Sequence, residues 1–332
     1  MASAARAVVT GGAGFIGSHM VDLLMERGFH VTVIDNLSRG RLDNLAGHRG
    51  DPRCEVHQID ATSVSAGSEL FRGARYVFHF AGLGDIVPSI EHPLEYMHAN
   101  VDGTLAVLEA ARHAQVEKLV YAASSSCYGA APPVPTSESA PIKPEYPYAL
   151  SKYLGEAAVL HWAEVYRLPC VSIRIFNAYG PRVRTTGVYG AVFGVFLAQK
   201  LKGRPLTVVG DGTQKRDFVY VTDVARAFLA AAESPESGEI FNLGADNPQP
   251  INRLVELIGG EVTYIPKRPG EPDCTWADTR KIRERLAWEP RVDFDQGVAA
   301  MLRDIHRWED APVWDPTSIA AATKTWFEFM AR

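Results

Sequence analysis

The sequence predicts a doubly wound parallel α/β fold with a smaller, interleaved α/β lobe. From the start of the chain to about residue 175, short apolar runs alternate with helical stretches, as expected for βαβ units around a parallel sheet. A cluster of glycines between Gly11 and Gly17 directly follows the first apolar run. After about Asn177 the alternation loosens, and glycine and proline separate shorter elements. We therefore assign residues 1–176 to the first domain and residues 177–332 mainly to the second lobe, with a C-terminal tail from about residue 308.

The expected elements of the first domain follow in order along the chain. Short apolar runs bounded by turn residues predict strands at 7–10, 30–35, 55–59, 76–80, 118–123 and 170–175. Between them, helical periodicity predicts helices at 15–27, 91–114 and 147–166. In the second lobe we expect strands at 206–209, 239–242 and 261–265, and helices at 224–233 and 252–258.

The composition argues against nucleic-acid, membrane and metal binding. The 332 residues carry a net charge of -5, with 46% hydrophobic and 22% charged side chains, so the chain is globular and has no basic stripe for phosphate backbones. Its longest apolar stretches are far shorter than the about 20 residues that span a bilayer. Residues 1–6 hold no apolar signal peptide, which predicts a cytoplasmic protein. Four scattered cysteines and ten histidines show no metal-ligand spacing, so we expect reduced thiols and no metal site.

The glycine cluster predicts a dinucleotide site. Gly11, Gly14 and Gly17 recur every third residue, and the third opens a helix. Such a turn lets the backbone approach a pyrophosphate that rests on the helix N-terminus. Asp35 ends the second strand, at the spacing of the carboxylate that accepts ribose hydroxyls and repels the extra phosphate of NADP. We therefore expect NAD and a Rossmann domain over residues 1–176, and we interpret the nearby Arg39 and Arg41 as solvated loop residues.

A tyrosine, a lysine and a serine form a candidate catalytic group. Tyr148 and Lys152 are four residues apart on a predicted helix, so both can point into one cleft. Ser124 follows a strand at the carboxyl edge of the sheet, where ligands bind in doubly wound folds. A phenol is a poor base at neutral pH, but an ammonium and a positive nicotinamide ring would lower its pKa. Tyr148 could then take a proton from a carbinol that loses hydride to NAD, while Ser124 binds the same oxygen.

Several further motifs accompany these residues along nearly the whole chain. They are Asp35-Asn36-Leu37-Ser38, Asp60-Ala61, His79-Phe80-Ala81-Gly82, Asn100-Val101-Asp102-Gly103-Thr104, Arg174-Ile175-Phe176-Asn177-Ala178-Tyr179-Gly180-Pro181-Arg182 and Gly210-Asp211-Gly212-Thr213-Gln214-Lys215-Arg216-Asp217-Phe218. With them the chain resembles the extended short-chain dehydrogenase/reductases, and within these the nucleotide-sugar 4-epimerases similar to UDP-galactose 4-epimerase.

The resemblance implies two sets of binding residues. The cofactor set comprises Gly11, Gly14, Phe15, Ile16, Gly17, Asp35, Asn36, Ser38, Asp60, Ala61, Phe80, Ala81, Gly82, Asn100, Tyr148 and Lys152. The substrate set comprises Ser124, Ser125, Ser126, Tyr148, Asn177, Arg184, Arg216, Arg268 and Glu271. In this set, Arg216 and Arg268 would clamp the diphosphate, Asn177 would touch it, and Glu271 would accept the nucleotide ribose hydroxyls. Guanidinium forks suit phosphate oxygens, which agrees with this assignment.

The resemblance also implies a reaction. Dehydratases and decarboxylases of the family carry carboxylates shortly after the matching serine or threonine, whereas this chain has Ser125 and Ser126. We therefore expect epimerisation at C4 of a UDP-hexose through a transient 4-keto intermediate, by a homodimer. A small residue, Thr275, at the family's gate position resembles epimerases of N-acetylhexosamines, whereas Arg184 resembles the carboxylate ligand of uronic-acid epimerases. The glucose, N-acetylglucosamine and glucuronate forms stay open, as do a net dehydratase or oxidoreductase and a non-catalytic NAD sensor.

Overall fold

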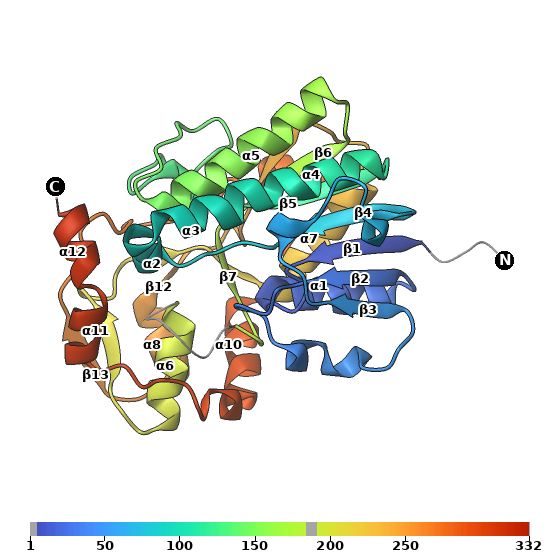
Figure 1. Ribbon diagram of the computed structural model, residues 1–332. Coiled ribbons are helices and arrows are strands. Elements are labelled where there is room, and N and C mark those ends of the chain that lie inside the picture. The colour runs from blue at the N-terminus through green and yellow to red at the C-terminus, as the bar shows by residue number, and fades with distance from the viewer. Residues whose placement is uncertain (1–4, 184–190, 332) are drawn as a thin grey trace.

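The computed structural model describes residues 5–183 and 191–331. At its centre is a seven-stranded sheet with the strand order β11-β6-β5-β4-β1-β2-β3 (Figure 1). Every neighbouring pair of strands in this sheet is parallel, which confirms the predicted doubly wound α/β fold. The strands are β1 Arg6–Thr10, β2 His30–Ile34, β3 Cys54–His57, β4 Ala74–His79, β5 Lys118–Ser124, β6 Cys170–Ile175 and β11 Glu239–Leu243. The strand order reverses between β1 and β4. Doubly wound folds bind ligands at such a reversal point, next to the carboxyl ends of the strands.

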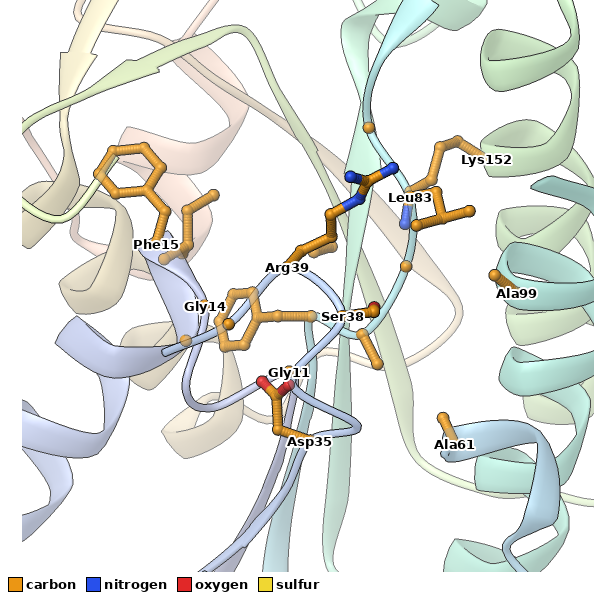
Figure 2. A pocket seen from close by; sticks show the side chains of 18 of the residues that line it. Gly11, Gly14, Phe15, Asp35, Ser38, Arg39, Ala61, Leu83, Ala99 and Lys152 are labelled. Atoms are coloured by element: carbon orange, nitrogen blue, oxygen red, sulfur yellow. The ribbon is translucent and has the colours of Figure 1, made fainter. Parts of the chain in front are cut away.

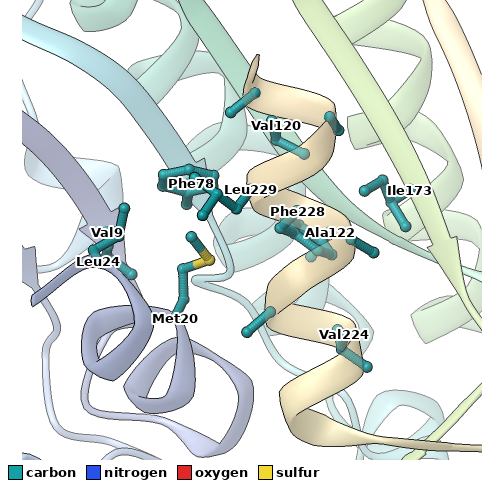
Figure 3. Packing of buried hydrophobic residues seen from close by; sticks show 14 of the residues in the cluster. Val9, Met20, Leu24, Phe78, Val120, Ala122, Ile173, Val224, Phe228 and Leu229 are labelled. Carbon is teal, nitrogen blue, oxygen red and sulfur yellow. The ribbon is translucent and has the colours of Figure 1, made fainter. Parts of the chain in front are cut away.

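Helices cover both faces of the sheet because its strands are apolar on both sides. The α1 helix (Phe15–Glu26) and the α7 helix (Val221–Glu233) pack on one face, where Val9, Phe78 and Ile173 point (Figure 3). The opposite face is covered by α4 (Gly103–His113) and α5 (Pro147–Val165). Adjacent strand residues point to opposite faces, as pleated backbone requires. A sheet buried on both faces holds the strand ends firmly enough to support a site.

The helix predicted over residues 91–114 is confirmed from Pro93 to His113, where helical backbone is continuous, but it begins two residues later than predicted. The structure has α2 (Ile86–Glu91), then α3 (Pro93–Met97), a π-helical turn (His98–Asp102) and α4. The backbone of His92 is non-helical, with φ -129° and ψ 58°. Proline disfavours the helical conformation in the residue before it and is itself well suited to the first turn of a helix, so the break falls before Pro93.

The second lobe has its own core. Trp308, Phe196 and Leu254 are buried there among apolar residues of several short elements. The strands of this part are β7 Asn177–Tyr179, β8 Leu206–Val209, β9 Lys215–Arg216, β10 Phe218–Tyr220, β12 Gln249–Pro250 and β13 Val262–Ile265, which form three two-stranded sheets. The helices of this core are α6 Val192–Leu201, α8 Ile251–Ile258 and α10 Phe294–Arg303, whereas α9 Arg280–Leu286 packs against β11 and α7 on the large sheet.

The chain returns to the large sheet after entering the second lobe. The β11 strand pairs with β6, and α7 packs against α1, although both follow residue 177. The strand near residues 239–242 and the helix near 224–233, which the sequence analysis grouped with the second lobe, therefore lie in or on the large sheet. Local patterns predict a strand or a helix, but they do not say which sheet it joins.

The tail ends in two short helices, α11 (Pro316–Ala322) and α12 (Lys324–Met330). They lie at the end of the molecule that carries the C-terminus, with α12 against α2 (Figure 1). The hydroxyl of Thr325 donates to Glu91 Oε1 at 2.9 Å. Among the helices that the structure describes, none combines the length and the hydrophobicity needed to span a bilayer.

Candidate active site

A cavity of about 490 Å³ lies at the reversal point of the strand order, above the carboxyl ends of β1, β2, β4 and β5. Residues of the predicted cofactor set line it, with the single exception of Asn100 (Figure 2). Lys152 reaches into it from α5, opposite Gly14 and Phe15 at the start of α1 (Figure 2). The structure thus brings together residues that are up to about 140 positions apart in the sequence.

The glycine turn has the shape that the sequence predicts. Gly11 has φ +68°, and a Cβ on it would lie 2.7 Å from the backbone nitrogen of Ala81. A Cβ on Gly17 would lie 2.1 Å from the carbonyl oxygen of Gly11. The Gly14 N-cap has no side chain, so it leaves the first turn of α1 open to the cavity. Side chains on Gly11 and Gly17 would collide with neighbouring backbone, so the tight turn requires glycine, and the open N-terminus of α1 beside it fits the pyrophosphate of a dinucleotide.

Asp35 is fixed by the backbone on the floor of the cavity. Its Oδ2 accepts from Ala13 N at 3.0 Å and its Oδ1 accepts from Leu37 N at 2.8 Å. Burial raises the pKa of Asp35, and these two hydrogen bonds oppose that shift. The guanidinium of Arg39 points away from Asp35 (Figure 2) and lies 3.9 Å from Asp85 across the cavity rim. Arg39 is therefore an ion-pair partner and not only a solvated loop residue.

Asn100 supports the cavity from behind. Its side chain is fully buried and does not line the cavity. Its Oδ1 accepts from Leu83 N at 2.7 Å, and its Nδ2 donates to Leu83 O at 3.0 Å and to Ser151 Oγ at 2.8 Å. These bonds hold the loop after β4 against α5. The amide thus shapes the wall of the cofactor cavity instead of reaching into it.

The predicted catalytic group is assembled at the junction of two cavities. Ser124 and Tyr148 line the cofactor cavity and also a neighbouring cavity of about 430 Å³. Lys152 lines the first cavity, with Nζ 4.4 Å from the centre of the Tyr121 ring. The hydroxyls of Ser124 and Ser126 are 2.9 Å apart. A reacting carbon at the junction would be within reach of a phenol, a serine hydroxyl and a molecule bound in the first cavity.

Burial dominates the acid–base properties of this group. It raises the pKa of Tyr148, and a hydrogen bond with Ser124 opposes that shift. Burial also lowers the pKa of Lys152 to about 7, with Glu156 acting in the opposite direction. Burial thus outweighs any lowering of the Tyr148 pKa by Lys152, and the part of the expected lowering that depends on the nicotinamide ring stays a prediction. Desolvation disfavours both charged forms, so the phenolate depends on positive charge brought by the ligand.

The second cavity contains the predicted anion ligands. Arg216, Arg268 and Glu271 line it, as do Ser125, Ser126 and Asn177. Glu271 lies between the two arginines: Arg216 Nη2 donates to its Oε1 at 2.8 Å, and Arg268 Nη1 is 3.7 Å from its Oε2. The three charged side chains are mostly buried, so their interactions are less screened than those on the surface. Two guanidinium groups at one cavity wall suit a diphosphate.

The gate position also lies in the second cavity. The Thr275 hydroxyl donates to Asn177 Oδ1 at 2.6 Å and accepts from Asp217 N at 3.3 Å. The small threonine therefore holds the Asn177 amide in place while it leaves room at the wall. Arg184 lies outside the described residues.

Sequence reasoning missed two aromatic residues of the second cavity, Tyr146 and Trp326. The rings of Tyr146 and Tyr148 are stacked, with 6.3 Å between centroids and 15° between planes. Trp326 comes from the tail, whose place the sequence left open. Tyr146 precedes the predicted helix by one residue, so its proximity to Tyr148 was a usable signal. The position of Trp326 had no such signal, because its contacts are with residues more than 50 positions away.

The fold and this site define an NAD-dependent enzyme of the extended short-chain dehydrogenase/reductase class. Residues 7–244 match the model of the NAD dependent epimerase/dehydratase family, and the chain belongs to this family. It is 35% identical over 302 residues to the UDP-glucose 4-epimerase of Mycolicibacterium smegmatis, an alignment that covers 89% of this chain and 96% of the relative.

The chain also resembles solved structures of relatives that hold UDP-sugars. A UDP-N-acetylglucosamine 4-epimerase from Methanobrevibacter ruminantium in complex with UDP-N-acetylmuramic acid has a TM-score of 0.86 at 32% identity, covering 92% of this chain and 98% of that one. A UDP-glucuronic acid 4-epimerase from Bacillus cereus in complex with UDP-glucuronic acid and NAD has a TM-score of 0.84 at 29% identity, covering 91% and 99%. The family and the fit of the glycine turn agree on NAD as the cofactor.

Proposed function

We propose that the protein interconverts the two C4 epimers of a UDP-hexose through a transient 4-keto sugar. The position of Ser124 and Tyr148 at the junction of the two cavities carries this proposal, because it places a base and a hydroxyl between a cofactor and a second ligand. The relatives named above act on UDP-sugars, which supports the same substrate class for this chain.

Each residue of the catalytic group has a distinct part in the proposed reaction. Tyr148 Oη takes the proton of the C4 hydroxyl and returns it after the sugar has presented its other face. Ser124 Oγ hydrogen-bonds the same oxygen and stabilises the negative charge that develops there. Lys152 binds the ribose of the cofactor and, when protonated, favours the phenolate. NAD, held by the residues of the first cavity, would supply the acceptor and later the donor of the C4 hydride.

The second cavity would hold the nucleotide diphosphate. Arg216 and Arg268 are placed at one wall to bind its oxygens, and Asn177 can donate from its amide. Glu271 accepts ribose hydroxyls in this proposal, after the diphosphate has replaced it as the partner of the arginines. Anchoring at the diphosphate leaves the hexose free to rotate near Tyr148, which epimerisation requires.

One observation favours an N-acetylated sugar as a second candidate substrate. The gate residue Thr275 is small and turned toward Asn177, so the wall near the hexose has room for a substituent at C2. For this reason we propose that UDP-glucose and UDP-N-acetylglucosamine be compared directly as substrates, with UDP-glucuronate as a third compound.

The test is proton NMR of purified protein with each of the three UDP-sugars and no added cofactor. We expect the 4-epimer to accumulate to equilibrium with at least one of them, without net NADH. Clean spectra with all three would reject the proposal. Stoichiometric formation of NADH, measured by absorbance, would instead identify an oxidoreductase. Loss of water from the sugar, measured by mass spectrometry, would identify a dehydratase. A protein that binds NAD and UDP without turnover would be a sensor.

We also propose that two copies associate through α4 and α5 into a four-helix contact. Leu150 and Leu154 lie one turn apart on α5, and each is 38% exposed. Two apolar side chains on one helix face suit an isologous contact. Light scattering of the parent and of Leu154→Glu tests this: the parent should have the mass of a dimer and the variant that of a monomer.

A further inference from the structure

The C-terminal helix α12 forms part of the wall of the second cavity. Trp326 is 7% exposed and lines this cavity, together with Thr323 at the start of α12. Its indole Nε1 donates to the carbonyl oxygen of Pro269 at 2.7 Å. The same helix is fixed to the first domain through the bond between Thr325 and Glu91 and through its packing on α2. It therefore connects the first domain to the loop that carries Arg268.

Three contacts join α12 to that loop and to the catalytic side of the cavity. The guanidinium carbon of Arg268 lies 5.8 Å from the centre of the Trp326 ring. The Trp326 and Tyr146 rings are 6.5 Å apart between centroids. A Cβ on Gly270 would lie 3.3 Å from the Met330 side chain, so the helix follows the turn closely. Trp326 thus lies between Arg268 and Tyr146, whose ring stacks on that of Tyr148.

We propose that Trp326 is a positioning residue for the nucleotide diphosphate, with α12 as the clamp on the Arg268 loop. The indole fixes the turn through Pro269 O and gives the guanidinium an aromatic face to rest on. An arginine that is held in its binding orientation loses less side-chain entropy when it binds an anion. The identity of the anion as a nucleoside diphosphate rests on the proposed function.

The contacts predict which kinetic quantity changes. Of the described residues that line the cofactor cavity, none belongs to α12, and Trp326 meets Tyr148 through the Tyr146 ring, so the chemistry at Tyr148 should be less affected than diphosphate binding. Loss of the clamp should act equally on every ligand that carries the diphosphate. A Trp326→Ala variant should therefore bind UDP and the UDP-hexose about tenfold more weakly, and it should raise KM about tenfold while kcat changes less than about twofold.

The experiment is isothermal titration of the NAD-loaded full chain with UDP and with the UDP-hexose. Trp326→Phe keeps an aromatic face but loses the bond to Pro269, so its affinity should lie between the parent and Trp326→Ala. Phe329→Ala, on the same helix and 57% exposed, is the matched control and should bind like the parent. Thermal unfolding confirms that each variant is folded, and Trp326→Phe carries the test if Trp326→Ala is not.

The outcomes separate this inference from the proposed function. Equal affinity of the parent and both Trp326 variants for UDP would overturn the clamp while epimerisation stands. Weakened UDP binding in a protein that epimerises none of the three sugars would support the clamp and defeat the proposed reaction. A parent that does not bind UDP would overturn both.

Discussion

Arg174 forms a buried ion pair with Glu156, with 2.6 Å between Nη2 and Oε1, one turn along α5 from Lys152. The side chains are 3% and 2% exposed. Arg174 Nη1 also donates to the Tyr128 hydroxyl at 2.6 Å, and Ser172 donates to Glu156 Oε2 at 2.8 Å. This network joins α5 to β6 one helical turn from Lys152.

Removal of one charge from this pair should destabilise the fold strongly. Glu156→Gln leaves the Arg174 guanidinium buried without a counter-charge, and we expect the free energy of unfolding to fall by about 3–5 kcal/mol. Urea unfolding of parent and variant measures it. Glu69→Gln, which breaks the exposed pair with Arg72, is the control and should change stability by less than about 1 kcal/mol. Equal effects of the two substitutions would contradict the role of the network.

Removal of the phenol should abolish turnover without loss of the cofactor. In Tyr148→Phe the ring still packs against Tyr146, but no base remains at the junction of the cavities. We expect kcat to fall about 10²–10⁴-fold, with NAD content unchanged. NMR turnover and release of bound NAD by denaturation measure the two quantities. The control is Tyr166→Phe at the C-terminal end of α5, where the side chain is 47% exposed. Parent-like turnover by Tyr148→Phe would exclude the tyrosine as the base.

The buried ammonium of Lys152 should make the cofactor-free protein less stable at lower pH. Its pKa is about 7 in the folded protein and 10.5 in the unfolded chain, so between these values the unfolded chain binds more protons. The penalty is therefore full below about pH 7 and decreases as the pH rises toward 10.5. Lys152→Met has no such penalty and should be more stable than the parent by about 2 kcal/mol near neutral pH.

Urea unfolding of NAD-free parent and Lys152→Met across this pH range gives the difference directly. Contributions of titrating groups that do not interact with Lys152, such as Lys118, are common to both proteins and cancel in that difference. The gap should narrow steadily with increasing pH. A constant gap would mean that Lys152 titrates normally in the folded protein.

A methyl group in the glycine turn should expel the cofactor. The Cβ of Gly17→Ala would meet the Gly11 carbonyl at 2.1 Å, so α1 or the turn must move. A shift that lowers binding by about 1.4 kcal/mol already reduces affinity tenfold, and we expect at least this loss of NAD affinity. Gly47→Ala, with no atom within 4 Å of its Cβ, is the matched control. Bound NAD per chain, measured after denaturation, decides the result; parent-like content in Gly17→Ala would show that the turn adapts.

The sequence predicted the elements of the sheet and the cofactor site because their signals are local. Buried parallel strands leave apolar runs, and the glycine turn requires a residue type that is visible without a structure. Tyr148 and Lys152 were found for the same reason, since helical spacing alone brings them together. The start of the helix at Pro93 had a local signal too, because proline disfavours helical backbone in the residue before it.

Long-range placement could not be predicted in the same way. The amide of Asn100 looks like a ligand in the sequence, but a buried partner, Ser151, and the backbone of Leu83 use its hydrogen bonds. The side of the molecule on which the tail packs depends on contacts between Trp326 and a loop more than 50 residues earlier. No periodicity or motif encodes such a contact, because many apolar surfaces could cover one tryptophan.

The position of β11 beside β6 has a consequence for recombination between relatives. A single crossover near residue 176 would join residues 1–176 of one protein to the remaining residues of another. The second protein would then supply the edge strand β11 and the helix α7 to the sheet of the first protein. Such a chimera would have to fit a parallel strand pair and a helix interface that never evolved together. An exchange of substrate specificity should therefore replace segments on either side of residues 221–243, while these residues stay with their own sheet.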